Sequence, residues 1–150
     1  MSKISINFVK LDNCVHTPEK TSEGAACYDI RAFLEKPVIL KPRERFSIPT
    51  GIKVQIPVGF MLSVRPRSGL AIKEGLTLIN SPGTIDSDFR GEIHILVINL
   101  GESEIKISNE ERIAQLVLEK TYEIKWEVKK EDDLSSTKRG EGGFGSTGKK

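Results

Sequence analysis

A chain of 150 residues is long enough for one domain with a modest hydrophobic core. Hydrophobic residues make up 37% of the chain and charged residues 29%, and the formal net charge is only +2. This near balance excludes the strongly basic surface of a typical nucleic-acid-binding protein, and no apolar run is long enough to cross a bilayer or to form a signal peptide. Two cysteines are too few for a disulfide scaffold. We therefore expect a cytoplasmic, intracellular protein with no nucleic-acid or membrane partner. Its hydrophobic core is lean, so we also expect an oligomer to complete the burial of apolar residues.

The dominant hydrophobic period along the chain is two. Apolar and polar residues alternate over 52–56, 104–107 and 122–128, which is typical of half-buried strands. The runs 60–64 and 93–98 are more continuously apolar and indicate strands that are buried on both faces. Glycine and proline separate these short runs, so the pattern predicts an all-β sandwich or jelly roll. A single short helix is expected over 68–73, with Ser68 as its N-cap.

The first segment with chemical potential is Ala25-Ala26-Cys27-Tyr28-Asp29-Ile30. It places one carboxylate, Asp29, within a small apolar stretch. Such a group either belongs to a functional site or is a buried structural aspartate with a paired partner.

The second segment, Arg65-Pro66-Arg67-Ser68-Gly69, follows a buried strand and precedes the expected helix. A guanidinium group, a hydroxyl and free backbone N–H groups at a helix start suit an anion such as phosphate. Taken alone, however, the segment favours an ordinary helix cap with a solvated arginine.

The third segment, residues 83–92, packs three carboxylates and an arginine into a turn between strands. Asp86 and Asp88 are two residues apart, so they would share one face of an extended backbone. One carboxylate could orient a water as a general base and another could hold a hydrated metal ion. The alternative is a hairpin whose charges are simply solvated.

The fourth segment, residues 112–117, places Gln115 inside an apolar strand. A buried amide must find hydrogen-bond partners, so we expect Gln115 to face a ligand or a subunit interface. His16 lies near a proline-rich loop, and His94 lies in a strand without a neighbouring cysteine or histidine, so a metal site built on histidine is not expected.

The C-terminal part of the chain changes composition twice. Residues 129–138 are charged and hydroxylic, which predicts a linker. Residues 139–150 are rich in glycine and also carry Arg139, Phe144, Ser146 and Thr147. Glycine allows close backbone approach, arginine and hydroxyl groups suit phosphate oxygens, and an aromatic ring can stack on a base. We interpret this tail as a flexible lid over a nucleotide; a disordered terminus of accidental composition is the alternative.

Taken together, the segments AACYDI, PRSGLA, GTIDSDFRGE, RIAQLV and RGEGGFGSTG resemble, in order and spacing, the five motifs of the homotrimeric dUTPase family (deoxyuridine 5'-triphosphate nucleotidohydrolases). The resemblance extends from about residue 24 to residue 148. It implies a jelly-roll core of the dUTPase-like β-clip type over 1–128, a linker over 129–138 and a flexible lid over 139–150. It also implies a homotrimer in which three chains share each active site, with the lid coming from a different subunit than the core pocket.

The resemblance further implies hydrolysis of dUTP to dUMP and pyrophosphate, with Mg²⁺, by attack of water on the α-phosphorus. This activity limits uracil in DNA and supplies dUMP for dTMP synthesis. Asp86 would orient the water, and Asp29 would hold the metal through its bound waters. A hairpin from Asn80 to Asp86 would read uracil without space at C5, and Phe144 would stack on the ring. The implied substrate-binding residues are Arg67, Ser68, Gly69, Asn80, Gly83, Thr84, Ile85, Asp86, Phe89, His94, Gln115, Arg139, Phe144, Gly145, Ser146 and Thr147.

Three positions depart from the family pattern. Phe89 stands where tyrosine is usual, so the ring is kept and the hydroxyl is lost. Glu110 occupies a turn position that is often glycine, and His94 a position where lysine or methionine is common.

Two other functions fit the same scaffold. A dCTP deaminase would need a glutamate placed to activate water at the base, and neither Glu92 nor Glu141 lies in such a motif. A non-catalytic interaction module would have no reason to keep Asp86, Arg139 and Phe144 together.

Overall fold

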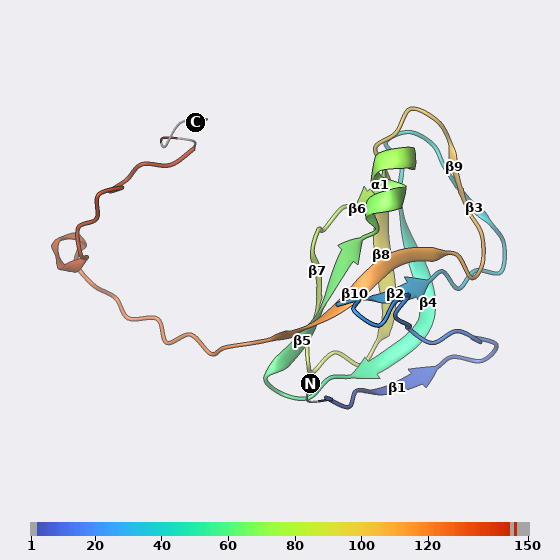
Figure 1. Ribbon diagram of the computed structural model, residues 1–150, viewed down its shortest axis with the longest axis horizontal. Coiled ribbons are helices and arrows are strands. Elements are labelled where there is room, and N and C mark those ends of the chain that lie inside the picture. Colours follow the sequence, from blue (N-terminus) through green and yellow to red (C-terminus); the bar gives the residue numbers. More distant parts are fainter. Residues whose placement is uncertain (1–2, 145, 147–150) are drawn as a thin grey trace.

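The computed structural model describes residues 3–144 and residue 146, and it is built almost entirely of strands (Figure 1). In chain order, its elements are β1 (Asn7–Lys10), β2 (Tyr28–Arg31), β3 (Val38–Leu40), β4 (Arg45–Gln55), β5 (Phe60–Pro66), α1 (Ser68–Glu74), β6 (Leu76–Leu78), β7 (Gly83–Ile85), β8 (Glu92–Asn99), β9 (Ile105–Ile107), β10 (Arg112–Lys120) and the 3₁₀ turn η1 (Glu131–Asp133).

The strands form two four-stranded sheets, ordered β1-β4-β8-β6 and β2-β10-β5-β7, and a two-stranded sheet of β3 and β9. Every pairing between these strands is antiparallel. Both four-stranded sheets contribute aliphatic side chains to one core, for example Ile48 and Ile93 from the first and Ile30 and Leu116 from the second. This arrangement confirms the all-β prediction and is consistent with the jelly-roll type.

Periodicity predicts parts of several strands and leaves most of the short ones unpredicted. The run 60–64 lies in β5, and the runs 52–56 and 104–107 overlap β4 and β9 with one residue outside each strand. No strand was expected at β1, β3 or β6, which have only three or four residues each. A strand this short shows too few alternations to stand out from its loops.

The expectation that 93–98 is buried on both faces is wrong for β8 within this chain. Ile93, Ile95 and Val97 are buried, whereas the residues between them alternate outward, and Leu96 is 38% exposed. Only one face of β8 packs on the core, because the sheet β2-β10-β5-β7 covers only that face of the sheet that contains β8. The apolar residues on the opposite face remain available to another molecule.

The strand expected over 122–128 is also not formed in the structure. β10 ends at Lys120, and the following residues leave the body of the molecule without joining a described sheet (Figure 1). The apolar side chains of the alternating run are strongly exposed, with Trp126 at 86% and Val128 at 100%. The sequence has the period of a strand, but the described part of this chain provides no neighbouring strand for it.

The predicted helix is present as α1, but Ser68 is not its cap. The helix begins at Ser68, Arg67 is the N-cap residue, and no side chain hydrogen-bonds to the free N–H groups there. Gly75 ends the helix in the left-handed conformation at φ 75°, which glycine adopts without strain. Within the described residues, no helix is long and apolar enough to cross a membrane.

Candidate active site

A pocket of about 280 Å³ lies beside β7, which pairs with β5 through Gly83 opposite Val64. The structure brings together here the residues predicted for the base and the sugar. The pocket is lined by Asn80, Gly83, Thr84, Ile85, Asp86, Phe89 and His94, together with Val64, Leu78, Glu92, Ile95 and Leu96.

The chain turns sharply after β7, and this turn separates the two aspartates. The N–H of Phe89 donates to the carbonyl of Asp86 at 3.2 Å, which closes a tight turn. Asp86 and Asp88 therefore do not share the face that an extended backbone would give them, and Asp86 lines the pocket whereas Asp88 does not. Arg90 stabilises the turn, because its Nη1 donates to the carbonyls of Ser87 at 2.7 Å and Phe89 at 2.8 Å.

Two glycines permit close packing at this pocket. A Cβ on Gly91 would lie 2.5 Å from Cζ of Phe89, so the ring packs directly over the Gly91 backbone. A Cβ on Gly83 would lie 3.1 Å from Nδ2 of Asn80, so the Asn80 amide lies over the start of β7. The positions of the Phe89 ring and the Asn80 amide therefore depend on Gly91 and Gly83 having no side chain.

His94 enters the same pocket from β8 and is held from two sides. Its Nδ1 is 3.0 Å from Oγ of Ser47, and its Nε2 is 3.5 Å from Oε2 of Glu92. The other oxygen of Glu92 accepts a hydrogen bond from the N–H of Gly51 at 2.7 Å. The imidazole is thus oriented by neighbours on β4 and β8.

A second cluster of polar residues surrounds Asp29 on β2. The carboxylate is 3% exposed, and it accepts hydrogen bonds from Nη1 of Arg112 at 3.0 Å and from Nε2 of Gln115 at 3.0 Å. Nε of Arg67 forms an ion pair with it at 3.6 Å. Arg67 also donates to the carbonyl of Arg112 at 2.9 Å. Asp29 is therefore buried and paired, and the Gln115 amide has the buried partner that its position requires.

The open side of this cluster is the start of α1. Ser68 and Gly69 are exposed, and a Cβ on Gly69 would meet only open space. A pocket of about 430 Å³ is lined by Arg31, Arg67 and Arg112 and also by Glu74, Glu110 and Glu111, among others. It shares no lining residue with the pocket of Asp86. The chain thus carries two separate pockets. Asp86 and Phe89 line one, and Arg31, Arg67 and Arg112 line the other.

Comparison with known proteins identifies the family of the chain that carries these two pockets. The model of the dUTPase family matches residues 13–148, which is most of the chain. The chain belongs to the dUTPase family. It is 53% identical over 141 residues to the deoxyuridine 5'-triphosphate nucleotidohydrolase of Chlamydia pneumoniae, covering 94% of this chain and 97% of that protein. It is 50% identical over 151 residues to the same enzyme of Bdellovibrio bacteriovorus, covering 99% of each.

Solved dUTPase structures agree with the fold. The dUTPase of Staphylococcus bacteriophage 80alpha with dUpNHpp superimposes with a TM-score of 0.86 at 27% identity, covering 97% of this chain and 99% of that chain. The dUTPase resemblance that the sequence motifs carry is thereby confirmed.

The described residues of the fifth dUTPase motif, 139–144 and 146, line neither of these pockets, and the chain before them leads away from the body of the molecule (Figure 1). Nε of Arg139 donates to the carbonyl of Gly142 at 2.7 Å, and Phe144 is fully exposed. Ser146 lies in the same segment, whereas Gly145 and Thr147 lie outside the described residues. Among the described residues of this tail, no hydrogen bond or ion pair reaches the core.

Sequence reasoning on the dUTPase motifs gave no role to Arg112, although the structure places it directly on Asp29. A signal was present. Arg112 lies three residues before Gln115, and the buried amide had already marked this strand as facing a polar partner.

Proposed function

We propose that this protein is a dUTP diphosphatase that hydrolyses dUTP to dUMP and pyrophosphate by attack of water on the α-phosphorus. The observation that carries the proposal is the pocket beside β7, where Asn80, Asp86 and Phe89 lie together. It offers an amide for a base edge, an aromatic face for a sugar and a carboxylate for a water. Family membership and the names of close relatives support the same reaction.

In this proposal the base and sugar bind beside β7. Asn80 and the backbone of Gly83, Thr84 and Ile85 read the edge of uracil, and the narrow hairpin leaves no space for the C5 methyl of thymine. The ring of Phe89 packs against C2′ of the deoxyribose, and His94 contacts the same substrate.

The triphosphate binds at the arginine cluster. Arg67, Ser68, Gly69 and Gln115 supply donors to its oxygens, and the buried Asp29 aims both Arg67 and Gln115 at the ligand. The tail completes the site with Phe144 on the uracil ring and with phosphate contacts from Arg139, Gly145, Ser146 and Thr147. Water is excluded when the tail closes.

The two halves of the site meet when chains associate. Within one chain the Asp86 pocket and the arginine cluster are separate, so we propose a homotrimer in which each active site takes its groups from different subunits. The exposed face of β8 and the unpaired alternating run 122–128 support association. The core of this assembly is residues 1–128, with 129–138 as linker and 139–150 as lid.

Mg²⁺ is the metal that this chemistry implies, and the residues present fit a metal that arrives with the substrate. Among the described residues no group of three or more histidine, cysteine, aspartate or glutamate side chains could hold a metal ion. Mg²⁺ prefers phosphate oxygens and waters to such a cage. Asp29 would hold it through one of those waters, since a carboxylate has lone pairs beyond those that its present donors occupy. When bound, the metal neutralises charge on the phosphates.

The chemical step asks the chain mainly for position and charge. Asp86 accepts a hydrogen bond from the attacking water and takes its proton, so that the oxygen reaches the α-phosphorus as the bond to the β-phosphate oxygen breaks. Arginine and amide donors stabilise the negative charge that moves onto the leaving pyrophosphate. The reaction limits uracil in DNA and supplies dUMP for dTMP synthesis.

Pyrophosphate release across dUTP, UTP, dTTP and dCTP tests the proposal. We expect turnover with dUTP and at least tenfold lower kcat/KM with each of the other three nucleotides, because each differs in an edge, a methyl or a hydroxyl that the pocket contacts. Ammonia release from dCTP would instead establish a deaminase. Absence of turnover with all four would indicate an interaction module.

Phe89 tests how the sugar is selected. Phe89→Tyr should change the ratio of kcat/KM for dUTP over UTP little, whereas Phe89→Ala should lower it about tenfold or more. A 2′-hydroxyl packed against the ring loses its water partner at a cost of roughly 1–3 kcal/mol, and the ring alone imposes this cost. Both ratios are measured side by side with the wild type. An unchanged ratio in the alanine variant would mean that another group reads the sugar.

A further inference from the structure

The turn that precedes β10 holds a glutamate in a backbone conformation that favours glycine. Glu110 has φ 65°, in the left-handed region where a side chain is strained. Its N–H donates to the carbonyl of Ala32 at 3.0 Å, and its carbonyl accepts from Nη1 of Arg31 at 2.8 Å. The backbone of this turn is therefore bound to the end of β2, at a cost in conformation that glycine would avoid.

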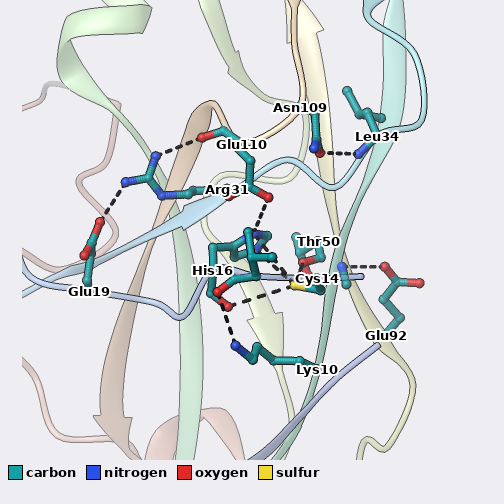
Figure 2. A network of polar contacts seen from close by, with 12 residues as sticks. Lys10, Cys14, His16, Glu19, Arg31, Leu34, Thr50, Glu92, Asn109 and Glu110 are labelled. Carbon is teal, nitrogen blue, oxygen red and sulfur yellow. Dashed lines mark hydrogen bonds and ion pairs between the residues drawn. The ribbon is translucent and has the colours of Figure 1, made fainter. Parts of the chain in front are cut away.

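The Glu110 side chain has a buried partner from the N-terminal segment (Figure 2). Its Oε1 is 3.1 Å from Nδ1 of His16, whose side chain is only 3% exposed. A carboxylate only accepts, so Nδ1 carries the hydrogen in this pair. The Cys14 thiol also contacts the ring, with Sγ 3.7 Å from Nδ1 and 3.8 Å from Nε2.

The thiol side of this cluster is neutral and fixed. Burial raises the pKa of Cys14, so the group stays a thiol at neutral pH, and its Sγ lies 3.7 Å from the carbonyl of Thr50. The thiol lies between the imidazole and Thr50 of β4, and the shortest polar contact of the imidazole is its hydrogen bond to Glu110.

Arg112 lies two residues after Glu110 and is the first residue of β10, where it pairs with Arg31 of β2. The register of this pairing shifts between Arg112 and Ala114, so the Arg112–Arg31 pair is separated from the regular ladder. The turn before β10 therefore contributes to the position of Arg112. From there Arg112 donates to Asp29, and its carbonyl accepts from Arg67. A displaced turn would move Arg112 and the groups that share Asp29 with it.

We propose that His16 is a positioning residue for triphosphate binding. Its hydrogen bond to Glu110 holds the strained turn, and the turn holds Arg112 where it orients Asp29, Arg67 and Gln115. This inference rests on the proposed function only in that Arg67 and Gln115 bind the phosphates. The His16–Glu110 hydrogen bond thus stabilises a backbone conformation that a glycine would adopt without any side-chain contact.

The His16–Glu110 pair is tested with the full-length His16→Leu variant. The leucine fills the buried space but has no hydrogen-bond donor for Glu110. We expect KM for dUTP to rise about tenfold with kcat within about threefold of wild type, because the pocket of Asp86 is untouched. His16→Asn, which keeps a donor close to the Nδ1 position, should retain a KM within about threefold. A purely structural His16 would lower the melting temperature and leave KM unchanged, and that result would overturn the proposal.

Rescue at the turn separates this inference from the proposed function. Adding Glu110→Gly to His16→Leu should return KM to within about threefold of wild type, because glycine adopts φ 65° without a side-chain anchor. A double variant that keeps the raised KM overturns the positioning role. A wild-type protein that does not hydrolyse dUTP overturns the proposed function itself. Arg43 also has a left-handed backbone conformation, at φ 71°, and it lies in the turn before β4. As a control, Arg43→Gly relieves the same kind of strain there and should leave KM unchanged.

Discussion

Replacing Asp86 by asparagine is expected to lower kcat for dUTP hydrolysis about 10²-fold or more while nucleotide affinity stays close to wild type. Asparagine keeps the size of the side chain and its place in the pocket, but it does not take a proton from water. The nucleotide in its ground state does not need that proton acceptor. Steady-state kcat and the Kd of the analogue dUpNHpp, measured on the same preparation, separate the two effects.

The neighbouring aspartate provides a matched control. Asp88 lies across the tight turn from Asp86 and does not line the pocket. Asp88→Asn removes the same charge from the same hairpin, so it should keep kcat within about threefold of wild type. Near-normal turnover in Asp86→Asn would rule out the assignment of Asp86, and an equal loss in both variants would point to hairpin charge rather than to a proton acceptor.

The sequence predicts the sheets well where a strand is long enough to show its period. β4 has eleven residues and β5 seven, and the alternating or dense runs within them marked both. The same rule failed at 122–128, where the alternation is real but no neighbouring strand lies in the described chain. Period reports which face of a strand is apolar, and it does not report which molecule covers that face.

The site residues remain a prediction from the sequence, and the structure adds which of them lie together. The hairpin from Asn80 to Asp86 came from the family resemblance, and its residues do line one pocket. The separation of Asp86 from Arg67 into two pockets within one chain is not predicted from the sequence, since spacing in the sequence carries no such distance. The His16–Glu110 contact joins positions far apart in the chain, and nothing local to either residue signals it.

A chain that ends at Lys138 should fold and trimerise, yet hydrolyse dUTP about 10²-fold more slowly than the full chain. The described residues among those removed form no hydrogen bond or ion pair with the core: Phe144 is fully exposed and Arg139 bonds only within its own loop. Their loss therefore costs the fold little. The open site loses the stacked ring and several phosphate donors, and bulk water screens the remaining charges.

A second truncation shows whether this loss belongs to the lid or to assembly. A chain that ends at Thr121 also lacks the exposed alternating run with Trp126 and Val128, which we expect to pack on another copy. It should lose trimer in sedimentation or light scattering, whereas the chain ending at Lys138 should keep it. Slow turnover in a trimeric Lys138 chain then assigns the effect to closure of the site, because the core pockets and their association are intact. If that chain instead fails to fold, the tail is structural, and its glycine-rich composition serves packing rather than catalysis.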